Sequence, residues 1–172
     1  MNGGLPRRLH AVILIAAVIV LGCWFGMVEV QIEGPDGWAS KLPTWRIEKG
    51  WALDLFLGGR ALTGYHAWVF TFMALIFHLP CALLAQWSWR IEARIIGCIA
   101  LFWIVEDFAW FIENPAFGFA KFDAAHAWWH KHWLLGAPVD YWIYLAVGGA
   151  LIAWSFGGKR EADSQQQIAD SG

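Results

Sequence analysis

The side chains best suited to chemistry lie in a short segment rich in histidine and tryptophan. Asp123, His126 and His130 form the pattern Asp-x2-His-x3-His there, and His132 follows two residues later. On a helix, His126 and His130 would be one turn apart and would face the same side. This spacing lets two imidazole rings reach one metal ion, although it also occurs in helices whose histidines face only water. Asp123 competes for a second role, as the N-cap of that helix.

A second group of candidate residues is acidic and lies near the end of a long apolar stretch. Glu106 and Asp107 interrupt that stretch, and Glu113 follows seven residues after Glu106, on the same helix face. A charged carboxylate inside a membrane helix costs about 2.5–3.5 kcal/mol on insertion scales. Such acids either have a function, or face a water-filled vestibule, or pair with a cation such as Arg60. We predict catalytic or proton-handling roles for Glu106, Asp107 and Glu113.

His66 brings the two groups together, because it lies near the start of another apolar stretch, at the membrane depth expected for Glu106. Imidazole and carboxylate ligands suit Zn, Fe or Cu. The sequence therefore predicts a transition-metal site, with Asp107 and Glu113 supporting it. The predicted ligands are His66, Glu106, His126 and His130.

Two alternatives use the same residues. Carboxylates beside neutral imidazoles could transfer protons without a metal. A haem would need two histidines that face each other at one depth, and His78 lies about 18 Å beyond His66 along the same helix. His10 and His126 are the remaining candidates for such a pair.

Composition excludes several classes of function. The chain has 172 residues, of which 59% are hydrophobic and only 15% charged, whereas a soluble domain usually has about 25% charged residues. Its net charge of -2 argues against nucleic acid as a partner. The sequence contains no GxGxxG, P-loop, GxSxG or CxxC motif, so it predicts no dinucleotide site, phosphate-binding loop or serine nucleophile.

Four apolar stretches are long enough to cross a bilayer, since about 20 helical residues cover about 30 Å. The sequence therefore predicts an all-α polytopic membrane protein, a bundle of four transmembrane helices with one or two short interfacial helices. The predicted spans cover about residues 9–30, 62–88, 91–113 and 139–157. They place residues 1–158 in one domain and leave 159–172 as a disordered cytoplasmic tail.

The first apolar stretch also resembles a signal peptide, with a loose lipobox that ends at Cys23. The apolar run continues beyond Cys23, which favours a retained helix over a cleaved lipoprotein.

The connections between the spans are rich in tryptophan, which prefers the membrane interface. They predict short surface helices over about residues 45–57 and 124–135. Lys and Arg number six on each side of the predicted topology. The set that includes both termini lies in shorter segments next to the helices, so the positive-inside rule puts both termini in the cytoplasm.

These observations predict a multi-pass protein of a bacterial-type inner membrane with a His/carboxylate site on its extracytoplasmic side. Its function would be that of a metal-dependent oxidoreductase or hydrolase acting on a lipophilic or small redox substrate. The alternative is a non-enzymatic accessory or assembly subunit of a membrane complex. The partners expected are the lipid bilayer and either another membrane protein or a second copy of the chain.

Overall fold

The computed structural model describes residues 6–157, which are mostly helical. Four of the described helices are long and apolar enough to span a membrane. They are α1 (Arg7–Glu33), α3 (Gly64–Leu84), α4 (Trp89–Glu113) and α5 (Val139–Gly157). The predicted tail at 159–172 lies outside the described residues.

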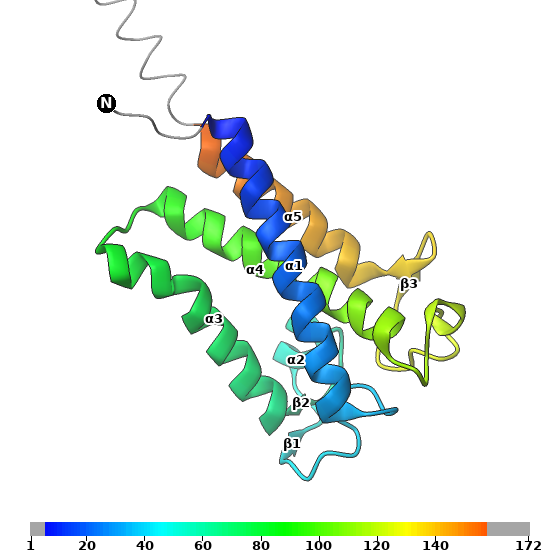
Figure 1. Ribbon diagram of the computed structural model, residues 1–172. Coiled ribbons are helices and arrows are strands. Elements are labelled where there is room, and N and C mark those ends of the chain that lie inside the picture. Colours follow the sequence, from blue (N-terminus) through cyan, green and yellow to red (C-terminus); the bar gives the residue numbers. More distant parts are fainter. Residues whose placement is uncertain (1–5, 158–172) are drawn as a thin grey trace, which may run out of the picture.

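The connecting segments hold the smaller elements. The first contains β1 (Arg46–Ile47), α2 (Trp51–Phe56) and β2 (Leu62–Thr63), and β1 pairs with β2 in an antiparallel two-stranded sheet. The second contains the 3-10 helix η1 (Phe119–Lys121) and an antiparallel pair, β3 (Trp133–Leu134) with β4 (Ala137–Pro138). Both connections lie at the same end of the helices, which we call the loop-rich end (Figure 1).

Helix α4 is the centre of the fold, because α1 and α5 both pack along it. Its buried core is formed around Phe102, which contacts Val18 of α1, Met73 of α3 and Ile152 of α5 in one apolar cluster. Helix α3 contacts α4 over a much shorter stretch. The two helices meet at the turn near residue 86 and diverge toward the loop-rich end (Figure 1).

Glycines set the close approach of α1 to α4. A Cβ atom added at Gly22 would lie 2.8 Å from Val105 Cγ1, and one added at Gly26 would lie 2.9 Å from the carbonyl oxygen of Glu106. Gly22 and Gly26 are four residues apart, the spacing that lets two helix backbones touch. The approach at Gly26 brings the last turns of α1 against α4 at Glu106.

A larger side chain at Gly26 should therefore separate the two helices. We expect Gly26→Leu to lower the free energy of unfolding by about 1–3 kcal/mol, as overpacking does in other cores. The check is thermal or denaturant unfolding in detergent micelles. The matched control is Gly149→Leu, because Gly149 is helical and has open space where its Cβ would lie. Equal losses in both variants would contradict the packing role of Gly26.

Two predicted surface helices differ from the structure. Helix α2 is shorter than the range predicted, because residues 46–47 form a strand instead. The prediction of a helix over 124–135 is wrong, since this segment forms turns and then the β3–β4 hairpin. Asp123 was predicted to be the N-cap of that helix. Its Oδ1 instead accepts hydrogen bonds from the backbone N–H groups of Ala125 and His126 within a turn.

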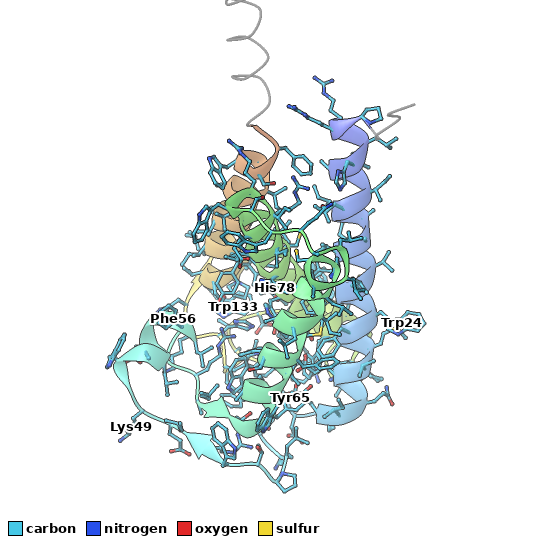
Figure 2. The ribbon with its side chains drawn as sticks, turned by 90° about the vertical axis from the view of Figure 1, so that its left-hand side faces the viewer. Trp24, Lys49, Phe56, Tyr65, His78 and Trp133 are labelled. Atoms are coloured by element: carbon cyan, nitrogen blue, oxygen red, sulfur yellow. The ribbon has the colours of Figure 1, made fainter. Side chains whose placement is uncertain are left out.

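The outer surfaces of the long helices are apolar. In the most apolar stretch of α3, only 6% of the residues are buried. Trp24 of α1 is 70% exposed and points away from the other helices (Figure 2). Such continuous exposed apolar surface is unfavourable in water and favourable in lipid.

Candidate functional site

A cavity of about 310 Å³ lies at the loop-rich end, where α1 and α4 finish and α3 and α5 begin. The two connections close it, the first with Trp38, Leu57 and Arg60 and the second with Trp129 and His130. Its polar lining is unusually rich in charge for a helical core. The ionisable residues around it are Glu29, Glu33, Arg60, His66, Glu106, Asp107, His130, Asp140, Tyr141 and Tyr144.

Glu29, Glu33 and His66 form the group that we call the acid–imidazole cluster. Each offers one ligand atom, and these three atoms all lie within 4.8 Å of one another. The residues are only 7%, 8% and 4% exposed, respectively. Burying two carboxylates beside each other is unfavourable unless protons or a cation offset their charge.

Local structure holds the cluster in place. Glu29 and Glu33 are one turn apart on α1 and so project from the same face. The Glu33 carboxylate accepts a hydrogen bond from the backbone N–H of Ala39, which fixes its direction. Thr63 caps α3, because its Oγ1 accepts from the backbone N–H of His66 at 3.2 Å.

The same threonine orients the His66 ring. Thr63 Oγ1 lies 2.7 Å from His66 Nδ1, and Trp38 stacks on the ring with centroids 3.9 Å apart. When Nδ1–H donates to Thr63, Nε2 presents a lone pair for another ligand. Metal-binding histidines are held in this way, with one ring nitrogen bonded to a protein oxygen.

Glu106 lies beside the acid–imidazole cluster. Its side chain neighbours that of Glu29, and the residue is 4% exposed. Its Oε1 is buried and has no hydrogen-bond partner among the residues that the structure describes. The Tyr65 hydroxyl is also buried beside Glu29. Glu29, Glu33 and Glu106 are therefore three carboxyl groups buried close together, and only protons or a cation would offset their charge.

The opposite wall of the cavity is a network of paired charges, which we call the Arg60–His130 network. Arg60 Nη2 donates to Asp140 Oδ2 at 2.8 Å. His130 Nε2 lies 3.0 Å from Asp107 Oδ2, and its Nδ1 lies 3.4 Å from Asp140 Oδ2. The Tyr141 hydroxyl also donates to Asp107. Each carboxylate of the network thus has at least two partners.

His130 is held as a cation by this network. Burial alone would lower the pKa of His130, but the charge of Asp107 and the hydrogen bonds to Asp107 and Asp140 raise it to about 9. At neutral pH the side chain therefore carries a proton. Both nitrogens of His130 face carboxylates, so the protonated ring donates toward Asp107 and Asp140.

The structure brings together four of the residues singled out from the sequence. His66, Glu106, Asp107 and His130 all line the cavity. His126 and Glu113 do not line it. His126 is exposed, and its Nδ1 lies 2.9 Å from Asp123 Oδ1. That contact holds the pKa of Asp123 below its ordinary range.

His78 is separate from this site. It lies much further along α3 than Tyr65 (Figure 2) and bonds Glu92 near the other end of α4, with 3.1 Å between Nε2 and Oε1.

Sequence reasoning missed Glu29 and Glu33, the two carboxylates of the acid–imidazole cluster. Two signals pointed to them: their spacing of four residues on one helix face, and their position at the same end as Glu106. It also missed Asp140 and Tyr141, which begin α5 and complete the Arg60–His130 network. Arg60 does pair with an acid, but with Asp140 rather than with Glu106 or Asp107.

The donor set of the acid–imidazole cluster fits a divalent metal ion. Two carboxylate oxygens and one imidazole nitrogen are ligands of Zn²⁺ and Fe²⁺, and three protein ligands leave a position open for water or substrate. A bound dication would also neutralise the charge of Glu29 and Glu33. The chain matches no protein-family model, and no curated protein and no solved structure is significantly similar to it.

Proposed function

We propose that this chain is a multi-pass membrane protein that binds one divalent transition-metal ion at Glu29, Glu33 and His66. The observation that carries the proposal is the acid–imidazole cluster: three ligand atoms within 4.8 Å of one another, on side chains that are almost fully buried. Two adjacent carboxylates are too costly to bury without a compensating charge. The oriented lone pair of His66 makes a metal ion a better match than protons alone.

The membrane part of the proposal rests on the helix surfaces. The long helices expose apolar side chains along most of their length, and polar residues collect at the loop-rich end. A bilayer around the helices would place the cavity near one membrane surface. The Lys and Arg distribution supports an extracytoplasmic position for that surface in a bacterial-type inner membrane, with both termini in the cytoplasm.

Hydrolysis is the reaction class that this geometry supports best. Glu29, Glu33 and His66 would hold the dication, which would supply an activated water as nucleophile at neutral pH. The protonated His130 lines the same cavity, and a leaving group that displaced Asp140 from Nδ1, the longer of its two contacts at 3.4 Å, would take up a proton there. Asp107 positions that imidazole. If iron occupied the cluster, the same open position would serve a redox reaction.

A second candidate function follows from the exposed aromatic and apolar side chains of the connections. Trp51 is 77% exposed and Leu135 is 85% exposed at the loop-rich end. These side chains would anchor the chain in headgroups or dock a membrane-protein partner, as an accessory subunit would. Native purification separates the two functions, because a stoichiometric partner without metal favours the accessory role.

Metal titration of the purified full chain tests the first proposal. We expect one Zn²⁺ or Fe²⁺ per chain, and at least a hundredfold weaker binding in Glu33→Ala and in His66→Ala. His126→Ala should bind as the unchanged protein does, because His126 lies outside the cavity. Glu48→Gln, at an exposed acid of the loop-rich end, is the matched control. Stoichiometric binding that survives loss of His66 but not of His126 would refute the assignment.

A further inference from the structure

The cavity is larger than a metal ion requires. At about 310 Å³ it falls at the lower end of the roughly 300–1,000 Å³ that organic ligands occupy in proteins. Its polar and apolar linings lie at different depths. Ile99 lies seven residues before Glu106 on α4, which places it about 10 Å further into the helices. Phe70, one turn beyond His66 on α3, lies on the same apolar side.

The apolar part of the cavity is lined by residues of both α3 and α4. Phe70 belongs to α3, while Ile99 and Ile104 belong to α4. The two helices separate toward this region in Figure 1, and they pack together over only a short stretch. The aliphatic chain of a ligand would contact these apolar side chains, with its polar end toward the acid–imidazole cluster.

The charges at the polar end define the head group of such a ligand. Both cations of the cavity are already paired, Arg60 with Asp140 and His130 with Asp107. In the metal-free protein, an anionic head would therefore meet no unpaired positive charge among the cavity-lining residues. Glu106 is the opposite case, because this cavity-lining carboxyl group lies beside another acid, Glu29, and pairs with no cation in residues 6–157. A positively charged donor satisfies a buried carboxylate best.

Aromatic rings around Glu106 favour the same head group. Trp103 and Trp110 lie three residues before and four residues after Glu106 on α4, and both line the cavity. Rings at these positions flank the carboxylate on one helix face. Tryptophan faces attract organic cations by about 0.5–2 kcal/mol, with the larger values in desolvated sites.

We propose that the cavity binds a single-chain lipophilic amine, with its ammonium group on Glu106 and its chain along Phe70, Ile99 and Ile104. As the substrate or product class of the metal site, this ligand rests on the proposed function. Its binding can be measured on its own, because Glu106 neighbours the ligand Glu29 but is not itself one of the proposed metal ligands. Loss of one proposal therefore leaves the other open to measurement.

Binding of radiolabelled dodecylamine to the full chain in nanodiscs tests the inference, with empty nanodiscs subtracted. We expect one saturable site per chain for dodecylamine, and at least tenfold weaker binding for dodecanol and dodecanoate. Glu106→Gln should weaken dodecylamine binding at least tenfold, and Glu48→Gln should leave it unchanged. Equal binding of dodecanoate, or no saturable site at all, would overturn the proposal.

Two further variants separate this result from that of the metal site. Ile104→Trp should fill the apolar part of the cavity and weaken dodecylamine binding while metal binding persists. Glu33→Ala should abolish metal binding while dodecylamine still binds. If Ile104→Trp leaves dodecylamine binding intact while metal binding shows that the variant is folded, the amine does not occupy this cavity.

Discussion

Replacing Arg60 by methionine is expected to destabilise the fold by about 3–5 kcal/mol, the usual cost of removing one partner of a buried ion pair. The Arg60 side chain is only 8% exposed and donates to Asp140 at 2.8 Å. Its Nε also donates to the carbonyl of Leu57 at 2.8 Å, so one side chain ties the first connection to α5. Arg60→Met keeps an unbranched apolar stem, although a shorter one. It leaves the Asp140 carboxylate without its guanidinium partner. The measurement is the free energy of unfolding in mixed micelles.

The double variant Arg60→Met/Asp140→Leu is the control for this effect. It removes both charges of the pair, so it should recover most of the stability that Arg60→Met loses. His130 also contacts Asp140, which keeps the recovery incomplete. A double variant that is less stable than Arg60→Met would show that Asp140 stabilises the fold mainly through His130 and not through the guanidinium.

The second large effect is a loss of stability with rising pH that depends on His130. Its pKa is raised in the folded protein from the ordinary 6.5 to about 9. A group with a raised pKa stabilises the fold fully below its unfolded value, and this contribution disappears as the pH rises through the folded value. The window therefore runs from about pH 6.5 to about pH 9. This shift in the pKa of His130 corresponds to a contribution of about 3 kcal/mol to the free energy of unfolding.

The comparison that isolates this effect uses His130→Gln. The free energy of unfolding should fall from pH 6.5 to pH 9.5 more steeply in the unchanged protein than in the variant. Other ionisable groups around His130 are Arg60, Asp107, Asp140 and Tyr141, and their titration is largely common to both proteins. Parallel curves would mean that His130 is neutral in the folded state.

The long helices could be predicted from the sequence because their signal is local. An uninterrupted apolar run of about 20 residues indicates a helix long enough to span a bilayer, whatever its neighbours are. The same local reading ended the first span at about residue 30, because charged residues usually mark a helix that leaves the membrane. Helix α1 continues to Glu33. The burial of both glutamates depends on Trp38, α3 and α4, which are contacts of long sequence separation.

The helix prediction for the histidine-rich segment was wrong for a related reason. Its i, i+4 spacing indicated a helix, but tertiary packing determines its conformation. Trp129 is buried and stacks on Phe111 with an interplanar angle of 10°, and Ala127 is fully buried in the same cluster. These contacts hold the chain in turns that send His130 inward and leave His126 exposed. Helical periodicity alone could not separate the two histidines.

X-ray absorption at the zinc edge of the zinc-loaded protein tests the central claim most directly. The acid–imidazole cluster predicts oxygen and nitrogen ligands at about 2.0–2.2 Å, with a single imidazole per zinc ion that disappears in His66→Gln. The ligand set predicted from the sequence alone would give three imidazoles, from His66, His126 and His130. A spectrum with two or more imidazoles per zinc, or one unchanged in His66→Gln, would contradict a metal ion bound by Glu29, Glu33 and His66.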